Sequence, residues 1–252
     1  MISMPRGRLF WGLTVWFAFE AVVVGSAVAN ENDAISMARQ RMVREIELTQ
    51  RAVSDETGQV GFAPRTLEVM SETPRHLFVP QDERHAAYAN RPLPIGHGQT
   101  ISQPYIVALM TDLLKVKPGD RVFELGTGSG YQAAILSKLG AEVYSVEIVE
   151  PLGRQAQDTL SRLDYSNVHV KVADGYYGWP EHAPFDAIIV TAAGSHVPPP
   201  LIEQLEAGGR MVIPIGTSFL TQYLMLVEKQ VDGSVTTRQV LPVKFVPLTG
   251  QH

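Results

Sequence analysis

The sequence predicts an α/β fold built on a doubly wound, mostly parallel sheet that finishes in an antiparallel hairpin. Three observations lead to this prediction. From residue 119 onward, short apolar runs alternate with helical patterns, which is typical of a parallel sheet. The first apolar run leads straight into a glycine-rich turn. The last two runs are joined by the turn residues 231–234, Val-Asp-Gly-Ser, which favour a hairpin.

The elements follow in order along the chain. An amphipathic pattern predicts a helix over 34–53, followed by a loop at 54–64 and a helix at 66–71 that ends before Pro74. A long irregular stretch, 90–104, precedes a helix at 105–114. The remainder predicts strands at 121–125, 142–147, 168–172, 185–191, 209–215, 223–230 and 236–245, with helices at 131–139, 151–163 and 199–206.

The composition of the chain excludes several classes of function. A chain of 252 residues with 45% hydrophobic content is long enough for one α/β domain with additions. Its net charge of −5 gives little electrostatic reason to bind nucleic acid. There are no cysteines, and the seven histidines have no metal-ligand spacing, so we expect neither thiolate chemistry nor a metal site.

The amino terminus has the layout of an export signal. Arg6 and Arg8 precede an apolar stretch, 9–28, which ends in Ala-Val-Ala at 27–29 before a polar run. We expect cleavage after Ala29 and an exported, periplasmic protein, or else membrane association through this segment. Glu20 interrupts the stretch and weakens both interpretations. The alternative is a cytoplasmic protein whose translation begins near residue 37 or 42. The predicted parts are therefore 1–29, a helical extension at 30–75, and a main domain at 76–252 that contains the loop 90–104.

The glycine turn predicts a nucleotide-like ligand. Glycines 126, 128 and 130 let the main chain turn tightly and approach a ligand, and the next helix directs its amino terminus there. The spacing is G-x-G-x-G, and Tyr131 occupies the place of the third glycine in the dinucleotide pattern. This spacing favours a cofactor without a pyrophosphate and disfavours a nicotinamide dehydrogenase.

Two acids follow at the same predicted edge of the sheet. Glu147 ends the second strand about twenty residues after the turn, where an acid can accept both ribose hydroxyls. Asp174 and Gly175 follow the third strand, and Asp174 is placed to accept an adenine amino group. The glycine turn and the two acids, in this order, resemble the Rossmann-like S-adenosylmethionine-dependent methyltransferases.

A longer resemblance is more specific. Residues 92–104 read P-L-P-I-G-H-G-Q-T-I-S-Q-P, which closely resembles a hallmark of the protein-L-isoaspartate O-methyltransferases. Similar blocks are R-H-L-F-V-P at 75–80, residues 124–134, F-D-A-I-I-V-T-A-A at 185–193 and V-K-F-V-P-L-T-G at 243–250, so the likeness spans about residues 75–250. It implies repair methylation of isoaspartyl, and also D-aspartyl, residues in damaged proteins and peptides.

The resemblance also implies roles for residues. Ser102 matches the active-site serine, and its hydroxyl is expected to donate to the acceptor carboxylate, with Gln99 and Thr100 as further substrate contacts. Capping the following helix is the structural alternative for Ser102. The residues expected to bind S-adenosyl-L-methionine are Glu124, Gly126, Thr127, Gly128, Gly130, Glu147, Asp174 and Gly175.

Two departures from the family pattern leave other functions open. Ala173 precedes Asp174 where the family usually has glycine, and Gly-Ser-His at 194–196 replaces the usual run near the expected substrate edge. The second departure puts substrate preference in doubt, so a methyltransferase with a small-molecule acceptor is the alternative. A third hypothesis is a protein specialised for export or binding that keeps the fold without catalysis.

Overall fold

The computed structural model describes Met1, residues 14–217 and residues 220–250, with side chains described from residue 33 onward within the long first helix. The chain divides into two compact units, Met1–Gln40 and Arg41–His252. Part of the predicted leader, residues 2–13, lies outside the described residues. Among the residues described, no helix is both long enough and apolar enough to cross a bilayer.

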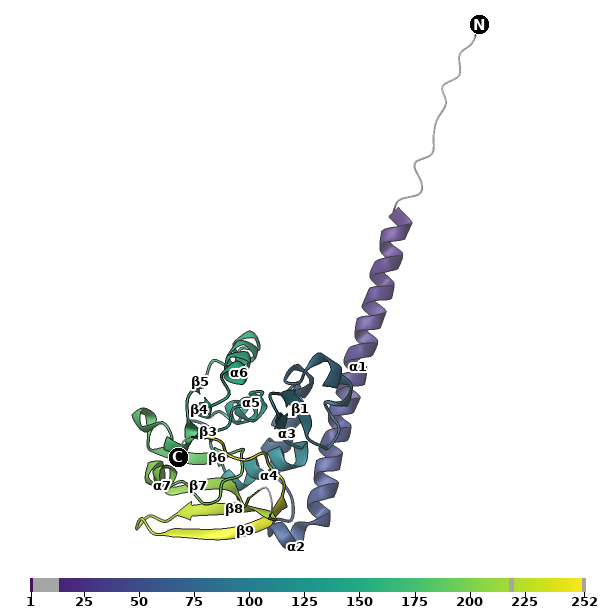
Figure 1. The fold of residues 1–252 in the computed structure, drawn as a ribbon. Helices are drawn as coiled ribbons and strands as arrows, with labels where there is room; N and C mark the ends of the chain where they lie inside the picture. Colours follow the sequence, from purple (N-terminus) through teal and green to yellow (C-terminus); the bar gives the residue numbers. More distant parts are fainter. Residues whose placement is uncertain (2–13, 218–219, 251–252) are drawn as a thin grey trace. The chain divides into compact units, whose positions relative to one another are not determined.

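The second unit contains a seven-stranded sheet in the order β5-β4-β3-β6-β7-β8-β9 (Figure 1). The strands β3 to β7 pair in parallel, whereas β7–β8 and β8–β9 pair antiparallel, as predicted. The strands are β3 (Arg121–Leu125), β4 (Glu142–Glu147), β5 (Val168–Val172), β6 (Phe185–Val190), β7 (Leu205–Ile215), β8 (Gln222–Lys229) and β9 (Val235–Val243).

Most helices lie close to the predicted positions, but the first helix begins twenty residues before its predicted start at residue 34. The helices are α1 (Thr14–Ala52), α2 (Ser54–Thr57), α3 (Pro64–Glu72), α4 (Pro104–Leu114), α5 (Tyr131–Lys138), α6 (Glu150–Arg162) and α7 (Pro199–Gln204), with 3₁₀ turns η1 (Arg75–Leu77), η2 (Gln81–Ala86), η3 (Gly175–Tyr177) and η4 (Pro180–His182). The predicted loop 54–64 thus begins with one helical turn. Strand β7 begins directly after α7, four residues earlier than predicted.

The irregular stretch 90–104 was only partly predicted correctly, because it contains a small hairpin. Strands β1 (Leu93–Gly96) and β2 (Gln99–Ile101) pair antiparallel, with His97 and Gly98 at the turn. Both turn residues have positive φ angles, 52° and 72°. Leu93 and Ile101 are buried, so alternation of apolar side chains fixes the face that the hairpin turns to the core.

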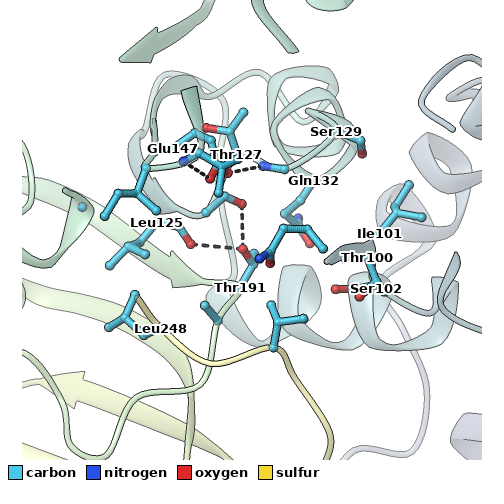
Figure 2. A pocket seen from close by; sticks show the side chains of 18 of the residues that line it. Thr100, Ile101, Ser102, Leu125, Thr127, Ser129, Gln132, Glu147, Thr191 and Leu248 are labelled. Carbon is cyan, nitrogen blue, oxygen red and sulfur yellow. Dashed lines mark hydrogen bonds between the residues drawn. The ribbon is translucent and has the colours of Figure 1, made fainter. Parts of the chain in front are cut away.

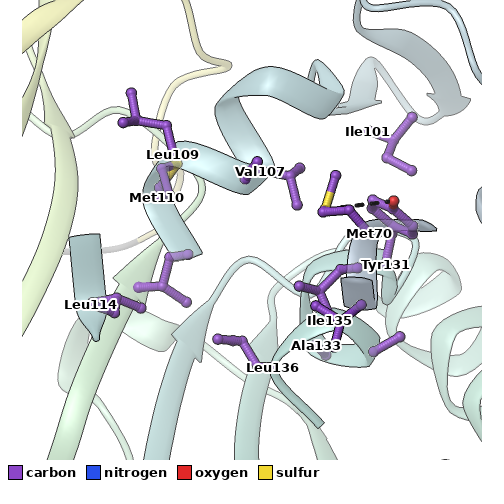
Figure 3. Close-up of a cluster of buried hydrophobic side chains, with 14 of the residues drawn as sticks. Met70, Ile101, Val107, Leu109, Met110, Leu114, Tyr131, Ala133, Ile135 and Leu136 are labelled. Atoms are coloured by element: carbon purple, nitrogen blue, oxygen red, sulfur yellow. Dashed lines mark hydrogen bonds between the residues drawn. The ribbon is translucent and has the colours of Figure 1, made fainter. Parts of the chain in front are cut away.

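Two hydrophobic clusters cover the two faces of the sheet, because successive strand side chains point to opposite faces. Val122 belongs to the cluster formed with α3, α4, α5 and α6, whereas Phe123 belongs to the cluster formed with α7. Figure 3 shows Met70, Val107 and Ile135 in the first cluster. These side chains come from α3, α4 and α5, so sequence-distant helices share one core.

The end of α1 belongs to the same core. Met42 and Ile46, which belong to the predicted apolar stripe of this helix, are fully buried, and so is the polar Gln50 one turn further on. Gln50 is a buried amide that accepts a hydrogen bond from the Tyr105 hydroxyl at 3.0 Å and donates to Thr57 Oγ1 at 2.8 Å. Residues from 41 onward are therefore built into the main unit.

Strand order reverses at β3, which pairs with β4 on one side and with β6 on the other. In open α/β sheets, ligands bind outside the carboxyl ends of the strands at such a point. The sheet topology therefore places a crevice beyond Leu125 and Val190.

Candidate active site

The turn after β3 requires glycine for two independent reasons. Gly126, Gly128 and Gly130 have φ angles of 97°, 53° and 86°, in the region that other residues rarely adopt. At Gly126, a Cβ atom would also lie 2.3 Å from Thr191 Oγ1. That hydroxyl donates to the Gly126 carbonyl at 2.7 Å, so β3 and the segment after β6 are joined at the turn.

The carboxylate of Glu147 holds the turn from the neighbouring strand. Its Oε2 accepts the Gly128 N–H at 2.8 Å, and its Oε1 accepts the Val149 N–H at 2.9 Å. A carboxylate has about four acceptor positions, so both oxygens keep capacity for hydroxyl donors of a ligand.

These groups line an open pocket of about 780 Å³, a volume that includes solvent at its mouth. In Figure 2, Thr100 and Ser102 lie on one side of it, Leu125 and Leu248 on the other, and Glu147 beside the glycine turn. The residues lining the pocket are Gln99, Thr100, Ile101, Ser102, Val107, Leu125, Gly126, Thr127, Gly128, Ser129, Tyr131, Gln132, Val146, Glu147, Ile148, Val149, Gly175, Thr191, Ala192, Val246, Pro247, Leu248 and Thr249.

The chemistry of this lining fits S-adenosylmethionine better than a dinucleotide. The charged residue among those lining the pocket is Glu147, and the lining contains no Lys, Arg or His. A pyrophosphate would meet a carboxylate without a compensating cation, whereas a sulfonium cation is electrostatically compatible with it. The lining is therefore compatible with a cationic ligand that carries donor hydroxyls.

The structure brings most of the predicted site residues together and leaves three outside the lining. Those lining the pocket are Gln99, Thr100, Ser102, Gly126, Thr127, Gly128, Glu147 and Gly175. Asp174 caps η3 by accepting the Tyr176 N–H at 3.0 Å. Gly130 sits at the start of α5, where a Cβ atom would lie 3.1 Å from Leu160. Direct cofactor contact by these residues and by Glu124 stays a prediction.

Glu124 lies beneath the pocket and is fully buried. Burial raises the pKa of Glu124 to about 8, against the lowering effect of a hydrogen bond from Ser145 and with a further rise from the Glu147 charge. The Ser145 hydroxyl donates to Glu124 Oε2 at 2.5 Å and lies 2.6 Å from Thr127 Oγ1. Either hydroxyl can be the donor in the Ser145–Thr127 contact, and Thr127 also lines the pocket.

Ser102 lies just after β2, and it does not cap α4. The N-cap residue is Gln103, and no side chain caps this helix. Within the described part of the chain, no hydrogen bond involves the Ser102 hydroxyl, while the Ser102 carbonyl accepts from Arg75 at 2.7 Å. The hydroxyl that faces the pocket is therefore available to a substrate.

A second open pocket, of about 1220 Å³ with the solvent at its mouth included, adjoins the first at Ser102. The two share Thr100, Ser102, Thr191 and Val246. The rest of its lining is mostly apolar and comes from α1, α4 and the end of β9: Thr49, Val53, Pro92, Gln103, Tyr105, Ile106, Leu241, Pro242, Val243, Lys244 and Phe245.

Sequence reasoning did not assign site roles to several lining residues. Ile148 directly follows Glu147 and is 39% exposed although it is apolar. An apolar residue directly after the acid that ends a strand is a sequence signal that could have marked Ile148 as a contact for a flat ring of the ligand. Thr191 and Leu248 belong to the family-like blocks 185–193 and 243–250, but no local spacing placed them at the pocket, because each reaches it through the folding of distant segments.

The departure at residues 194–196 lies outside the residues that line these two pockets. His196 is 3.1 Å from the Tyr176 hydroxyl and 3.0 Å from Ser195 Oγ. Gly194 bridges to Ile215. This segment therefore gives no direct reason for a changed acceptor. The described residues also contain no cluster of three acid or histidine side chains suited to a metal ion.

Comparison with known proteins agrees with this geometry. Residues 26–252 match the model of the protein-L-isoaspartate(D-aspartate) O-methyltransferase family. The chain belongs to this family. A relative from Cupriavidus necator named protein-L-isoaspartate O-methyltransferase 1 is 60% identical over 99% of this chain and 95% of its own length. One from Polaromonas sp., named protein-L-isoaspartate O-methyltransferase 2, is 63% identical over 84% of this chain and 100% of its own.

A solved structure supports the same assignment. It is titled a putative protein-L-isoaspartate O-methyltransferase from Plasmodium falciparum in complex with S-adenosyl-L-homocysteine. It is similar with a TM-score of 0.69 and 26% identity, over 84% of this chain and 98% of that chain. The family makes this chain an S-adenosylmethionine-dependent methyltransferase with a Rossmann-like fold.

Proposed function

We propose that this chain methylates the free carboxylate of L-isoaspartyl residues in damaged proteins and peptides, and also accepts D-aspartyl residues. The observation that carries the proposal is the meeting of two pockets at Ser102. One pocket has the acid and the glycine turn suited to the methyl donor, and the other adjoins it at Ser102 and leaves room for a peptide segment.

On the donor side, Glu147 accepts the two ribose hydroxyls while it holds the Gly128 and Val149 N–H groups. Thr127 lines the same pocket, and its hydroxyl is hydrogen-bonded to Ser145 at 2.6 Å. When bound, S-adenosylmethionine supplies an electrophilic methyl group on a sulfonium sulfur.

On the acceptor side, Ser102 donates its hydroxyl proton to one carboxylate oxygen and leaves the other oxygen free to react. No general base is required, since a carboxylate with a reference pKa of about 4 is already ionised at neutral pH. Thr100, which lines both pockets, is assigned a further contact with the acceptor, and so is Gln99, which lines the donor pocket. Catalysis then depends mainly on holding acceptor and donor in line, which is the entropic contribution of a preorganised site.

The test of this function compares two peptides that differ only in the linkage of one aspartate. The full chain should transfer methyl groups from S-adenosylmethionine to the isoaspartyl peptide and not to its normal-aspartyl twin. Methylation of small carboxylic acids with neither peptide modified would instead select the small-molecule alternative. Equal methylation of both peptides would contradict recognition of the isoaspartyl linkage.

Replacing Ser102 with alanine is expected to lower kcat/KM for the isoaspartyl peptide by about 10- to 100-fold, the worth of a hydrogen bond to a charged group. Calorimetry should show S-adenosylmethionine affinity close to wild type, because Ser102 lies on the acceptor side. Ser195→Ala is the matched control, since Ser195 lines neither pocket. Wild-type turnover by Ser102→Ala would refute the role of Ser102.

We also propose that residues 1–29 direct export. Arg6 and Arg8 before the apolar stretch 9–28, and the small residues at 27–29, support this. The full chain, produced in a bacterial host with a periplasm, should be recovered from the periplasm with Asn30 as its first residue by intact-mass measurement. Ala29→Leu should block the cleavage. A cytoplasmic chain beginning at Met1, Met37 or Met42 would contradict export.

A further inference from the structure

Arg75 is a buried cation without an acidic partner. Its side chain is fully buried, and none of the ion pairs formed by the described residues includes it. Desolvation lowers the pKa of Arg75 to about 10, so it remains charged at neutral pH. Burying a charge without a counter-charge costs free energy. We therefore expect Arg75 to have a role that an apolar side chain at this position could not fulfil.

The contacts of the guanidinium connect the two sides of the active site. Nη2 donates to the Ser102 carbonyl at 2.7 Å, and Nε donates to the Ala87 carbonyl at 2.9 Å. The guanidinium carbon lies 4.8 Å from the centre of the Tyr131 ring. Tyr131 is the first residue of α5, directly after the glycine turn, and both Tyr131 and Ser102 line the donor pocket.

These contacts of Arg75 require a guanidinium group. A planar guanidinium can donate in two fixed directions while a tyrosine ring covers its face, whereas a lysine ammonium is a compact point charge without this fork. Tyr131 itself is fixed in the core beside Met70 and Ile101 (Figure 3). The peptide of Ser102 is thus tied to a rigid part of the donor side.

We propose that Arg75 is a positioning residue that sets the place of the Ser102 hydroxyl relative to the methyl donor. It acts through the Ser102 carbonyl and touches neither substrate. The inference rests on the proposed function, since it assigns to Arg75 the placement of the acceptor-binding serine. In the sequence, Arg75 stands out only as the first residue of the family-like block at 75–80.

The test is a double-mutant cycle with Arg75→Met and Ser102→Ala in the full chain. Arg75→Met removes the charge and keeps an apolar side chain of moderate size, a type of change that buried ion sites often tolerate. We expect kcat for the isoaspartyl peptide to fall by about 10- to 100-fold, with S-adenosylmethionine affinity within about threefold of wild type. Ser102→Ala should then cost at most a few-fold more, because the serine is already misplaced.

A purely structural role predicts a different pattern. Arg75→Met would then lower thermal stability and donor affinity, and Ser102→Ala would cost the same factor in both backgrounds. Arg75→Lys keeps the charge and provides a second variant if Arg75→Met does not fold, with the same coupling expected. Arg210→Lys is the matched control, because Arg210 also donates to a backbone carbonyl, that of Leu113, away from both active-site pockets.

The possible outcomes distinguish a failure of the inference about Arg75 from a failure of the proposed function. Coupled losses support the positioning role. An active wild type with additive losses overturns the role of Arg75 alone. A wild type that binds S-adenosylmethionine but leaves isoaspartyl peptides unmodified overturns the proposed function, and the inference with it.

Discussion

Replacing Glu147 with glutamine is expected to weaken S-adenosylmethionine binding by at least about 100-fold. The carboxylate accepts two backbone N–H groups, and we assign to it two ribose hydroxyls as well. Hydrogen bonds to a charged acceptor contribute about 1.5–3 kcal/mol each, and tenfold in affinity corresponds to about 1.4 kcal/mol. The amide nitrogen of glutamine would also face a backbone N–H, a donor opposite a donor.

Titration calorimetry with S-adenosylmethionine measures this effect directly. Glu150→Gln is the matched control, because Glu150 is exposed, lies three residues further along and pairs with Arg154 outside the pocket. The control should bind with wild-type affinity. Affinity within threefold of wild type for Glu147→Gln would mean that this acid does not hold the donor.

The second large expected effect is a pH dependence of the free energy of unfolding that arises from Glu124. Its folded-state pKa is about 8, mainly because burial disfavours the charged form, compared with 4.5 for the ordinary side chain. Between these values the folded protein keeps a proton that the unfolded chain has lost. The stabilising contribution of protonated Glu124 to the free energy of unfolding is therefore fully present below pH 4.5. It declines as the pH rises toward 8 and does not change further above that pH.

Glu124→Gln is expected to remove this dependence, because an amide does not titrate. The free energy of unfolding of the variant, relative to wild type, should rise by several kcal/mol between pH 5 and pH 8.5, with about 5 kcal/mol as the upper bound from the shift. Urea denaturation at a series of pH values gives this difference. Globular proteins have only about 5–15 kcal/mol of stability in total, so the effect is large.

An exposed glutamate provides the control for this measurement. Glu181→Gln, in η4, should follow the wild-type profile in parallel. A relative stability of Glu124→Gln that stays flat from pH 5 to pH 8.5 would show that Glu124 titrates at the same pH in the folded and unfolded states. The assignment of a protonated acid beneath the pocket would then be wrong.

Much of the fold was predictable because it depends on local signals. Strands β3, β4 and β5 have the predicted ends, and the turn at 231–234 closes the β8–β9 hairpin through a Gln230 N–H bond to the Ser234 carbonyl of 2.7 Å. Apolar periodicity and turn residues act within a few positions of the chain. The hairpin at 93–101 was missed because His97, a non-glycine residue, takes a positive φ at its turn.

The site was predictable to the extent that one strand end and one turn define it. Gly126, Gly128 and Glu147 were found by their order along the chain, and sheet topology brings them together. Thr191 and Leu248 were not found as site residues, because they reach the pocket through β6 and through the segment after β9. No spacing in the sequence encodes such an approach.

By itself, the sequence determined the alternation of elements, the glycine turn, the two acids and the family to which the chain belongs, since each is written in residues close together or in an extended motif. Only the tertiary structure decided that Glu124 is buried with a raised pKa, that the Ser102 hydroxyl is available, and that Arg75 joins Ser102 to Tyr131. The physical reason is that burial and long-range hydrogen bonds depend on which distant segments pack together. The local conformational propensity of a segment carries no information about which distant segment it will pack against.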